Sequence, residues 1–107
     1  MPDALLVLTT VADRAAASAL AQALLERRLA ACVNIGAPVD SLYHWRGRIE
    51  TGQEIPLTIK TRAVLYDQVE AAIRALHDYE LPEIIAVPVS RGYGPYIGWL
   101  EDETSAG

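Results

Sequence analysis

Hydrophobic residues along this chain change their spacing several times, and each spacing predicts a different element. Residues 4–10 form a short, almost continuous apolar run, which is typical of a buried strand. Apolar residues then recur every three or four positions after Asp13, which predicts a capped helix over about 14–28. The same helical spacing returns later in the chain and predicts a second helix over about 63–77.

Strand-like segments follow each of the two helices. Their β-branched and aromatic content predicts a strand over about 30–45, which residues 36–38 interrupt and divide into 30–35 and 40–45, and further strands over about 55–61 and 84–89. Gly47 marks a tight turn just after the 40–45 part of the first strand. We therefore expect the chain beyond Gly47 to pair back on that strand as a hairpin.

Two prolines mark special points in this pattern. Pro56 cannot donate a hydrogen bond to a neighbouring strand, so we expect a bulge or a free sheet edge there. Pro95 follows a glycine-rich turn and suits the start of a short helix over residues 96–101. Residues 101–107 have the composition of a fraying tail.

The predicted order of elements is β-α-β-β-α-β followed by a short helix. This order indicates an α+β, ferredoxin-like sandwich in which both helices cover one face of the sheet, as a single domain over 1–107. Residues 4–8 and 84–89 are apolar at both alternating positions, which favours strands that are buried on both faces. We therefore expect another copy of the chain to cover the second face, unless the C-terminal segment folds over it.

Composition and charge exclude several classes of protein. The chain has 107 residues, and its net charge of −5 comes from an excess of acids in residues 54–107, which argues against nucleic acid as a partner. Cys32 is the only cysteine, so no internal disulfide can form and a reducing compartment is the simple interpretation. We find no signal peptide and no apolar run long enough for a membrane helix. We therefore expect a cytoplasmic protein with no membrane partner.

Polar side chains on two of the predicted strands form a first candidate site. Strand alternation places Cys32 and Asn34 on one side of their strand, and Thr58 and Lys60 on one side of theirs. If the helices cover the aliphatic face, all four side chains lie on the face that we assign to subunit contact. Cys32 could be a soft-metal ligand or a small buried hydrophobic residue. Lys60 could bind an anion or extend its charge to solvent.

The connection between the second helix and the last strand carries an unusual set of polar groups. His77 could be a metal ligand or an acid–base group, or a helix-terminal cation that interacts with the last carbonyls of the helix. Glu80 and Glu83 could bind a hard metal or hydrogen-bond donors, or could be solvated loop charges. Tyr79 is expected to pack rather than to act chemically.

Aromatic residues offer a possible pocket or an interface. They gather in two places, Tyr43-His44-Trp45 and Tyr93, Tyr96 and Trp99. Such groups could line a ligand pocket or anchor a partner. No glycine-rich phosphate loop, CxxC, HExxH or GxSxG motif occurs, so we do not expect an enzyme.

Several segments together resemble the CutA family of divalent-cation tolerance proteins. They are LAACVNI, SLYHWRGRIE, IKTR, LHDYELPEIIAVPV and YIGWL, in that order and across essentially the whole chain. The resemblance implies a ferredoxin-like fold, a compact and stable homotrimer, and a link to copper and other divalent metals. It implies no required cofactor, although a divalent metal such as copper could bind. Because that trimer is similar to the PII signalling proteins, a module that binds a small anionic metabolite is the alternative.

The resemblance also implies roles for particular residues. Cys32, His77 and Glu80 are the candidate metal ligands, with Cys32 and His77 approaching each other across a cleft between subunits. The remaining candidate cleft residues are Lys60, Tyr43, Trp45, His44, Tyr79 and Glu83. In this chain His44 replaces an aromatic residue common in the family, and Asp78 replaces a common proline.

Overall fold

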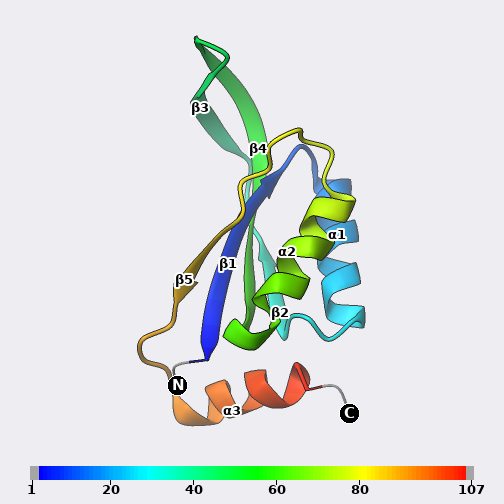
Figure 1. Cartoon of the computed structure of the whole chain (residues 1–107), viewed down its shortest axis with the longest axis vertical. Coiled ribbons are helices and arrows are strands. Elements are labelled where there is room, and N and C mark those ends of the chain that lie inside the picture. Colours follow the sequence, from blue (N-terminus) through cyan, green and yellow to red (C-terminus); the bar gives the residue numbers. More distant parts are fainter. Residues whose placement is uncertain (1–2, 106–107) are drawn as a thin grey trace.

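The secondary structure follows the predicted order (Figure 1). A computed structural model describes residues 3–105. The elements are β1 (Ala4–Val11), α1 (Arg14–Glu26), β2 (Cys32–Ile35), β3 (Val39–Trp45), β4 (Arg48–Arg62), the 3₁₀ turn η1 (Ala63–Leu65), α2 (Tyr66–Leu76), β5 (Ile85–Pro88) and α3 (Gly94–Glu103).

The strands form one antiparallel sheet in the order β2-β4-β1-β5, with β3 paired to the far part of β4. β1 and β4 are central and pair over their full overlap, from Ala4 opposite Arg62 to Val11 opposite Ile55. The predicted α+β, ferredoxin-like class is therefore confirmed.

Helices α1 and α2 lie together on one face of the sheet (Figure 1). The core between them is fully buried, with zero exposure for Val7 of β1, Ile59 of β4, Leu24 of α1 and Ile73 of α2. Burying each such side chain contributes about 1.5–3 kcal/mol relative to leaving it in water. The helical spacing in the sequence therefore marks the residues that hold the two layers together.

Helix α1 begins as predicted but ends two residues early. The Asp13 carboxylate accepts a hydrogen bond of 2.8 Å from a first-turn amide, which is the expected N-cap. The helix ends at Glu26, because Arg28 adopts a left-handed conformation with φ of 54°. The Leu29 amide then donates to the Leu24 carbonyl at 2.9 Å, so the end is closed by a Schellman motif.

The hairpin extends from the body as an arm (Figure 1). We call residues 39–54 the hairpin arm. Its turn has positive φ at Arg46 (50°) and Gly47 (80°), the conformation of the tight type I′ hairpin. Beyond the turn the chain continues as a single strand, Arg48–Arg62, so the separate strand predicted over 55–61 is part of β4.

Regular pairing is interrupted opposite Pro56, where the sequence predicted a bulge or a free edge. Ile35 lies opposite Leu57, and Val39 lies opposite Glu54. Three residues of one chain segment therefore face two of β4, which shifts the register by one. This offset joins the body of the sheet to the hairpin arm.

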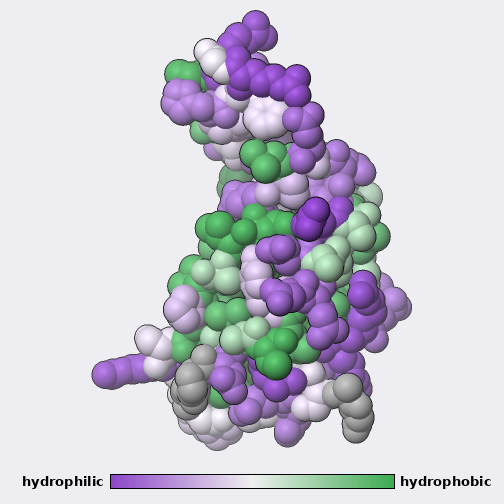
Figure 2. Space-filling view, in the orientation of Figure 1, coloured by the Kyte–Doolittle hydropathy of each residue, from purple (hydrophilic) through white to green (hydrophobic). Residues whose placement is uncertain are grey.

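The second face of the sheet is only partly covered. Leu6 and Leu8 of β1 are half-buried, and their neighbours Ile85 and Val87 on β5 are 52% and 46% exposed. Figure 2 shows hydrophobic residues gathered on the side of β5, whereas the tip of the arm is mainly hydrophilic. A single copy of the chain thus leaves apolar sheet surface in contact with water.

Helix α3 covers one end of this face. The prediction that residues 101–107 form a fraying tail is wrong for residues 101–105. The helix runs to Glu103, and Thr104 is 3% exposed, so residues 101–105 do not fray. The Arg62 Nε donates to the Thr104 hydroxyl at 2.8 Å, which ties the end of the helix to β4. Residues 106–107 of the predicted tail lie outside the described residues. No helix within residues 3–105 is long and apolar enough to cross a membrane.

Candidate functional site

An open groove lies between the hairpin arm and the loop that connects α2 to β5. We call residues 77–83 the 77–83 loop. The groove contains six of the nine predicted site residues, Tyr43, His44, Trp45, Tyr79, Glu80 and Glu83. The other residues that line it are Thr10, Asp40, Ser41, Leu42, Glu54, Leu81 and Pro82. The structure thus unites two segments that the sequence suggested separately.

The groove is acidic. Four carboxylates line it, from Asp40, Glu54, Glu80 and Glu83, and no lysine or arginine is among its lining residues within 3–105. Aromatic rings of the arm and of the 77–83 loop form the rest of its walls. Such a surface attracts cations and repels anions.

Glu80 is held by a residue that the sequence did not single out. One nitrogen of Arg46, Nη2, donates to both carboxylate oxygens of Glu80, at 2.9 and 3.0 Å. The Arg46 guanidinium also lies 5.2 Å from the centre of the Trp45 ring. This contact joins the turn of the hairpin arm to the 77–83 loop.

His77 is fixed by hydrogen bonds on both ring nitrogens. The Tyr79 amide donates to Nδ1 at 3.1 Å, so Nδ1 carries no proton. Nε2 lies 2.7 Å from the Thr10 carbonyl oxygen and therefore donates to it as the protonated nitrogen. His77 caps α2 in an extended conformation, and its ring bonds to β1 rather than to the last helix carbonyls, which were one of its alternative partners.

Tyr79 packs, as predicted. Its ring meets the His77 ring edge-on, with 4.5 Å between centroids. Burial and the neighbouring Glu54 carboxylate raise the pKa of Tyr79 to about 12. Glu54 also accepts a hydrogen bond of 3.1 Å from the Thr10 hydroxyl, so β1, the arm and the loop meet here.

The predicted polar patch on the second sheet face is present but separate from the groove. Cys32 lies opposite Lys60 and Asn34 lies opposite Thr58, so all four share one face of the sheet, as strand alternation predicted. Cys32 is half-buried. The Lys60 ammonium lies 5.8 Å from the Tyr96 ring, so α3 contacts this patch.

Within one chain the three candidate ligands do not converge. His77 bonds to Thr10, which lies opposite Pro56, whereas Cys32 lies opposite Lys60. Four residues along a strand span about 13 Å. Within residues 3–105 no group of three or more His, Cys, Asp or Glu side chains is placed to hold a metal ion.

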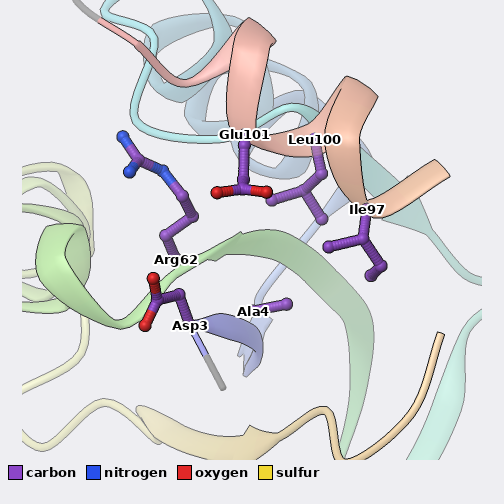
Figure 3. Close-up of a pocket in the computed structure, with 6 residues that line it drawn as sticks. All are labelled: Asp3, Ala4, Arg62, Ile97, Leu100 and Glu101. Carbon is purple, nitrogen blue, oxygen red and sulfur yellow. The ribbon is translucent and has the colours of Figure 1, made fainter. Parts of the chain in front are cut away.

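A small pocket beneath α3 contains no predicted site residue (Figure 3). It is lined by Asp3, Ala4, Arg62, Ile97, Leu100 and Glu101. The Arg62 guanidinium is bonded to Thr104 rather than directed at a ligand. The pocket is therefore a gap in the packing of α3 against the sheet.

Sequence reasoning missed Arg46, Glu54 and Thr10. The sequence analysis singled out only Gly47 in the hairpin turn, and the partner of Arg46 lies 34 residues away. Glu54 and Thr10 are 44 residues apart and carry no local motif. Only the pairing of β1 with β4 brings them together, so no signal in the sequence alone could have found them.

Comparisons of the sequence and of the structure with known proteins point to the same family. The CutA1 divalent ion tolerance protein family profile matches residues 5–103. The divalent-cation tolerance protein CutA of Thermus thermophilus is 41% identical over 98 residues, covering 92% of this chain and 95% of that protein. The crystal structure of CutA from Xylella fastidiosa superposes with a TM-score of 0.93 at 43% identity, covering 96% of this chain and 99% of that one.

The relatives also correct the expected cytoplasmic location. The Archaeoglobus fulgidus structure, at 33% identity and a TM-score of 0.93 over 95% of this chain and 99% of that one, is named a periplasmic divalent cation tolerance protein. The Arabidopsis thaliana relative, 38% identical over 94% of this chain, is named chloroplastic. Because similar domains work in different compartments, cytoplasmic location does not follow from this sequence. This chain spans only 55% of the Arabidopsis protein's length.

Proposed function

We propose that this chain, which belongs to the CutA1 divalent ion tolerance protein family, works as a homotrimer that binds divalent cations such as copper. Divalent-cation tolerance is the function in the name of its Thermus relative. The proposal adds a direct mechanism, in which the protein holds the ion itself and performs no catalysis. The ion is therefore its ligand and not a resident cofactor.

The observation that carries this proposal is the exposed apolar part of the second sheet face. Leu6, Leu8, Ile85 and Val87 form neighbouring cross-strand pairs, and α3 covers only the far end of the face. Apolar surface of this kind in one copy favours contact with further copies. The hairpin arm, with Leu42 and Ile49 each 69% exposed, offers more surface for the same purpose.

Assembly would also bring the candidate ligands together. Cys32 lies on the outer strand β2 and His77 lies at the other end of β1, so a cleft between copies can unite them where a single chain does not. A thiolate, an imidazole and the Glu80 carboxylate suit copper or zinc better than calcium or magnesium. Three donors leave room for water, which favours exchangeable binding.

The alternative, a PII-like module for a small anionic metabolite, has less support. The groove is lined by four carboxylates, whereas Lys60 lies on the other patch beside Tyr96. Anions would be repelled from the aromatic groove unless assembly supplied cationic groups.

A titration tests the proposal. Metal-free protein is titrated with copper and zinc in a calorimeter under reducing conditions, beside Cys32→Ser and His77→Ala. Asn34→Ala is the matched control, because it lies two residues from Cys32 on the same face and removes no soft donor. We expect saturable binding in the parent and the control and its loss in both ligand variants. Unchanged binding in the ligand variants, or stabilisation by an anionic metabolite alone, would contradict the proposal.

A further inference from the structure

The 77–83 loop carries two of the three candidate ligands, and both are already engaged inside the chain. Arg46 donates two hydrogen bonds to the Glu80 carboxylate. The Tyr79 amide donates to Nδ1 of His77, which uses the one lone pair of that imidazole. An arriving cation must therefore compete with a guanidinium for the carboxylate and with an amide for the ring.

We propose that cation binding at the 77–83 loop is coupled to release of the hairpin arm, with Arg46 acting as a built-in competitor for Glu80. This inference rests on the proposed cation-binding function and adds a conformational response to it. The competing group is part of the turn of the arm, so displacing it releases that turn from the loop, while Glu54 at the base of the arm stays beside Thr10 and Tyr79.

The attachment of the arm makes such a response possible. Within residues 3–105, polar side-chain contacts join the arm to the rest of the chain at its base, where Glu54 lies beside Thr10 and Tyr79, and at its turn. Glu54 bonds to Thr10 at the base of the arm, whereas Arg46 bonds to Glu80 from its turn. Losing the second contact frees the turn while the base stays attached.

The strength of the contact suits a reversible exchange. The side chains of Arg46 and Glu80 are each 69% exposed, and ion pairs of that exposure contribute little to stability because water screens them. A divalent cation carries twice the charge of the guanidinium that it replaces. Removing Arg46 should therefore strengthen cation binding by about two- to fivefold, the range that exposed ion pairs imply.

The His77 contacts assign the ligating atom. Nε2 donates to the Thr10 carbonyl, an arrangement that orients metal-binding histidines in other proteins. Nδ1 is then the nitrogen that becomes free when the Tyr79 amide moves. Cation binding at Nδ1 and displacement of Arg46 therefore both alter the 77–83 loop.

Zinc titration of the full chain tests this inference, because zinc has no redox chemistry and accepts nitrogen, oxygen and sulfur ligands. Arg46→Gln is compared with Arg48→Gln. Both variants lose one positive charge from the arm, but Arg48 lies 3.7 Å from Glu50 within the arm and does not contact the loop. We expect Arg46→Gln to bind zinc about two- to fivefold more tightly than Arg48→Gln.

Hydrogen exchange supplies an independent measurement. Zinc should accelerate amide exchange near the turn of the arm and at Tyr79 in the parent, and Arg46→Gln should show the faster arm exchange without zinc. Equal zinc affinities in the two arginine variants, or unchanged exchange on zinc binding, would overturn the coupling while leaving the proposed function intact. Absence of zinc binding in the parent would instead overturn the proposed function, and the coupling with it.

Discussion

Nε2 of His77 lies 2.7 Å from the carbonyl oxygen of Thr10 and donates a hydrogen bond to it. This contact joins the end of α2 to the end of β1 across 67 residues of sequence. With the Tyr79 amide on Nδ1, it fixes the imidazole and the start of the 77–83 loop. His77 therefore helps to hold the loop that forms one wall of the acidic groove.

Removing that imidazole should destabilise the fold. We expect His77→Ala to lower the free energy of unfolding by about 1–3 kcal/mol, because a backbone carbonyl and an amide lose their partner. His44→Ala is the control, since His44 is exposed on the arm and has neither bond. Urea unfolding measures both variants, and an equal loss in the two would contradict this role for His77.

The turn of the hairpin arm requires a residue that tolerates positive φ. Gly47 has φ of 80° and open space around it, so Gly47→Ala should cost about 1–2 kcal/mol from backbone strain alone. Gly52→Ala in the same arm also meets open space but has no positive φ, and it should be neutral or slightly stabilising. Thermal unfolding of the two variants compares them directly. Equal changes in thermal stability would contradict the claim that positive φ at Gly47 makes its replacement costly.

Tyr79 should titrate late and make stability depend on alkaline pH. Folding raises its pKa from the ordinary value of 10.0 to about 12, so the folded state keeps the proton longer than the unfolded state. Its contribution to stability is therefore complete below pH 10 and decreases as the pH rises from 10 to about 12. Tyrosinate absorbance and urea unfolding across this range measure both effects.

Phenylalanine variants identify the group responsible. Tyr79→Phe should remove one late-titrating phenol and reduce the loss of stability above pH 10. Tyr93→Phe is the control at an exposed tyrosine, since Tyr93 is 76% exposed. The late titration of Tyr66, whose pKa is raised by its hydrogen bond to Glu70, should remain in both variants. Identical titration curves for the parent and Tyr79→Phe would refute the assignment.

The exposed sheet face should control assembly. Val87→Asp places a charge on the apolar surface beside Leu6, and we expect it to dissociate the proposed trimer because burying that carboxylate is costly. Val64→Asp is the control, since Val64 is 71% exposed on η1 away from this face. Light scattering with size-exclusion chromatography gives the mass of each variant. A Val87→Asp protein with the mass of the parent would contradict assembly through this face.

The fold could be predicted because its signals are local. Helical spacing predicted α1 and α2, Asp13 caps α1 and Gly47 forms the hairpin turn, although Leu76, at an apolar position of the second helical pattern, is 52% exposed. The wrong predictions concern segments whose structure depends on contacts with distant parts of the chain. Residues 101–105 look like a polar tail, yet Arg62 bonds to Thr104 and holds the end of α3 on the sheet.

The candidate site was predicted less completely for the same reason. Strand alternation is a local property and predicted the shared sheet face of Cys32 and Lys60, whereas their direct pairing depends on the register of β2 with β4. The contacts of Arg46 with Glu80 and of His77 with Thr10 join distant segments, and no neighbouring residue in the sequence indicates either contact. These contacts determine which candidate ligands are free to bind a cation, and the sequence alone does not reveal them.

Zinc binding by the assembled and the dissociated protein tests the central claim most directly. The parent, Val64→Asp and Val87→Asp are titrated with zinc by calorimetry, with circular dichroism confirming that each is folded. If the cation site forms between copies, the parent and Val64→Asp bind zinc with equal affinity, and the dissociated Val87→Asp protein does not. Zinc binding of undiminished affinity by a folded, monomeric Val87→Asp protein would contradict the account.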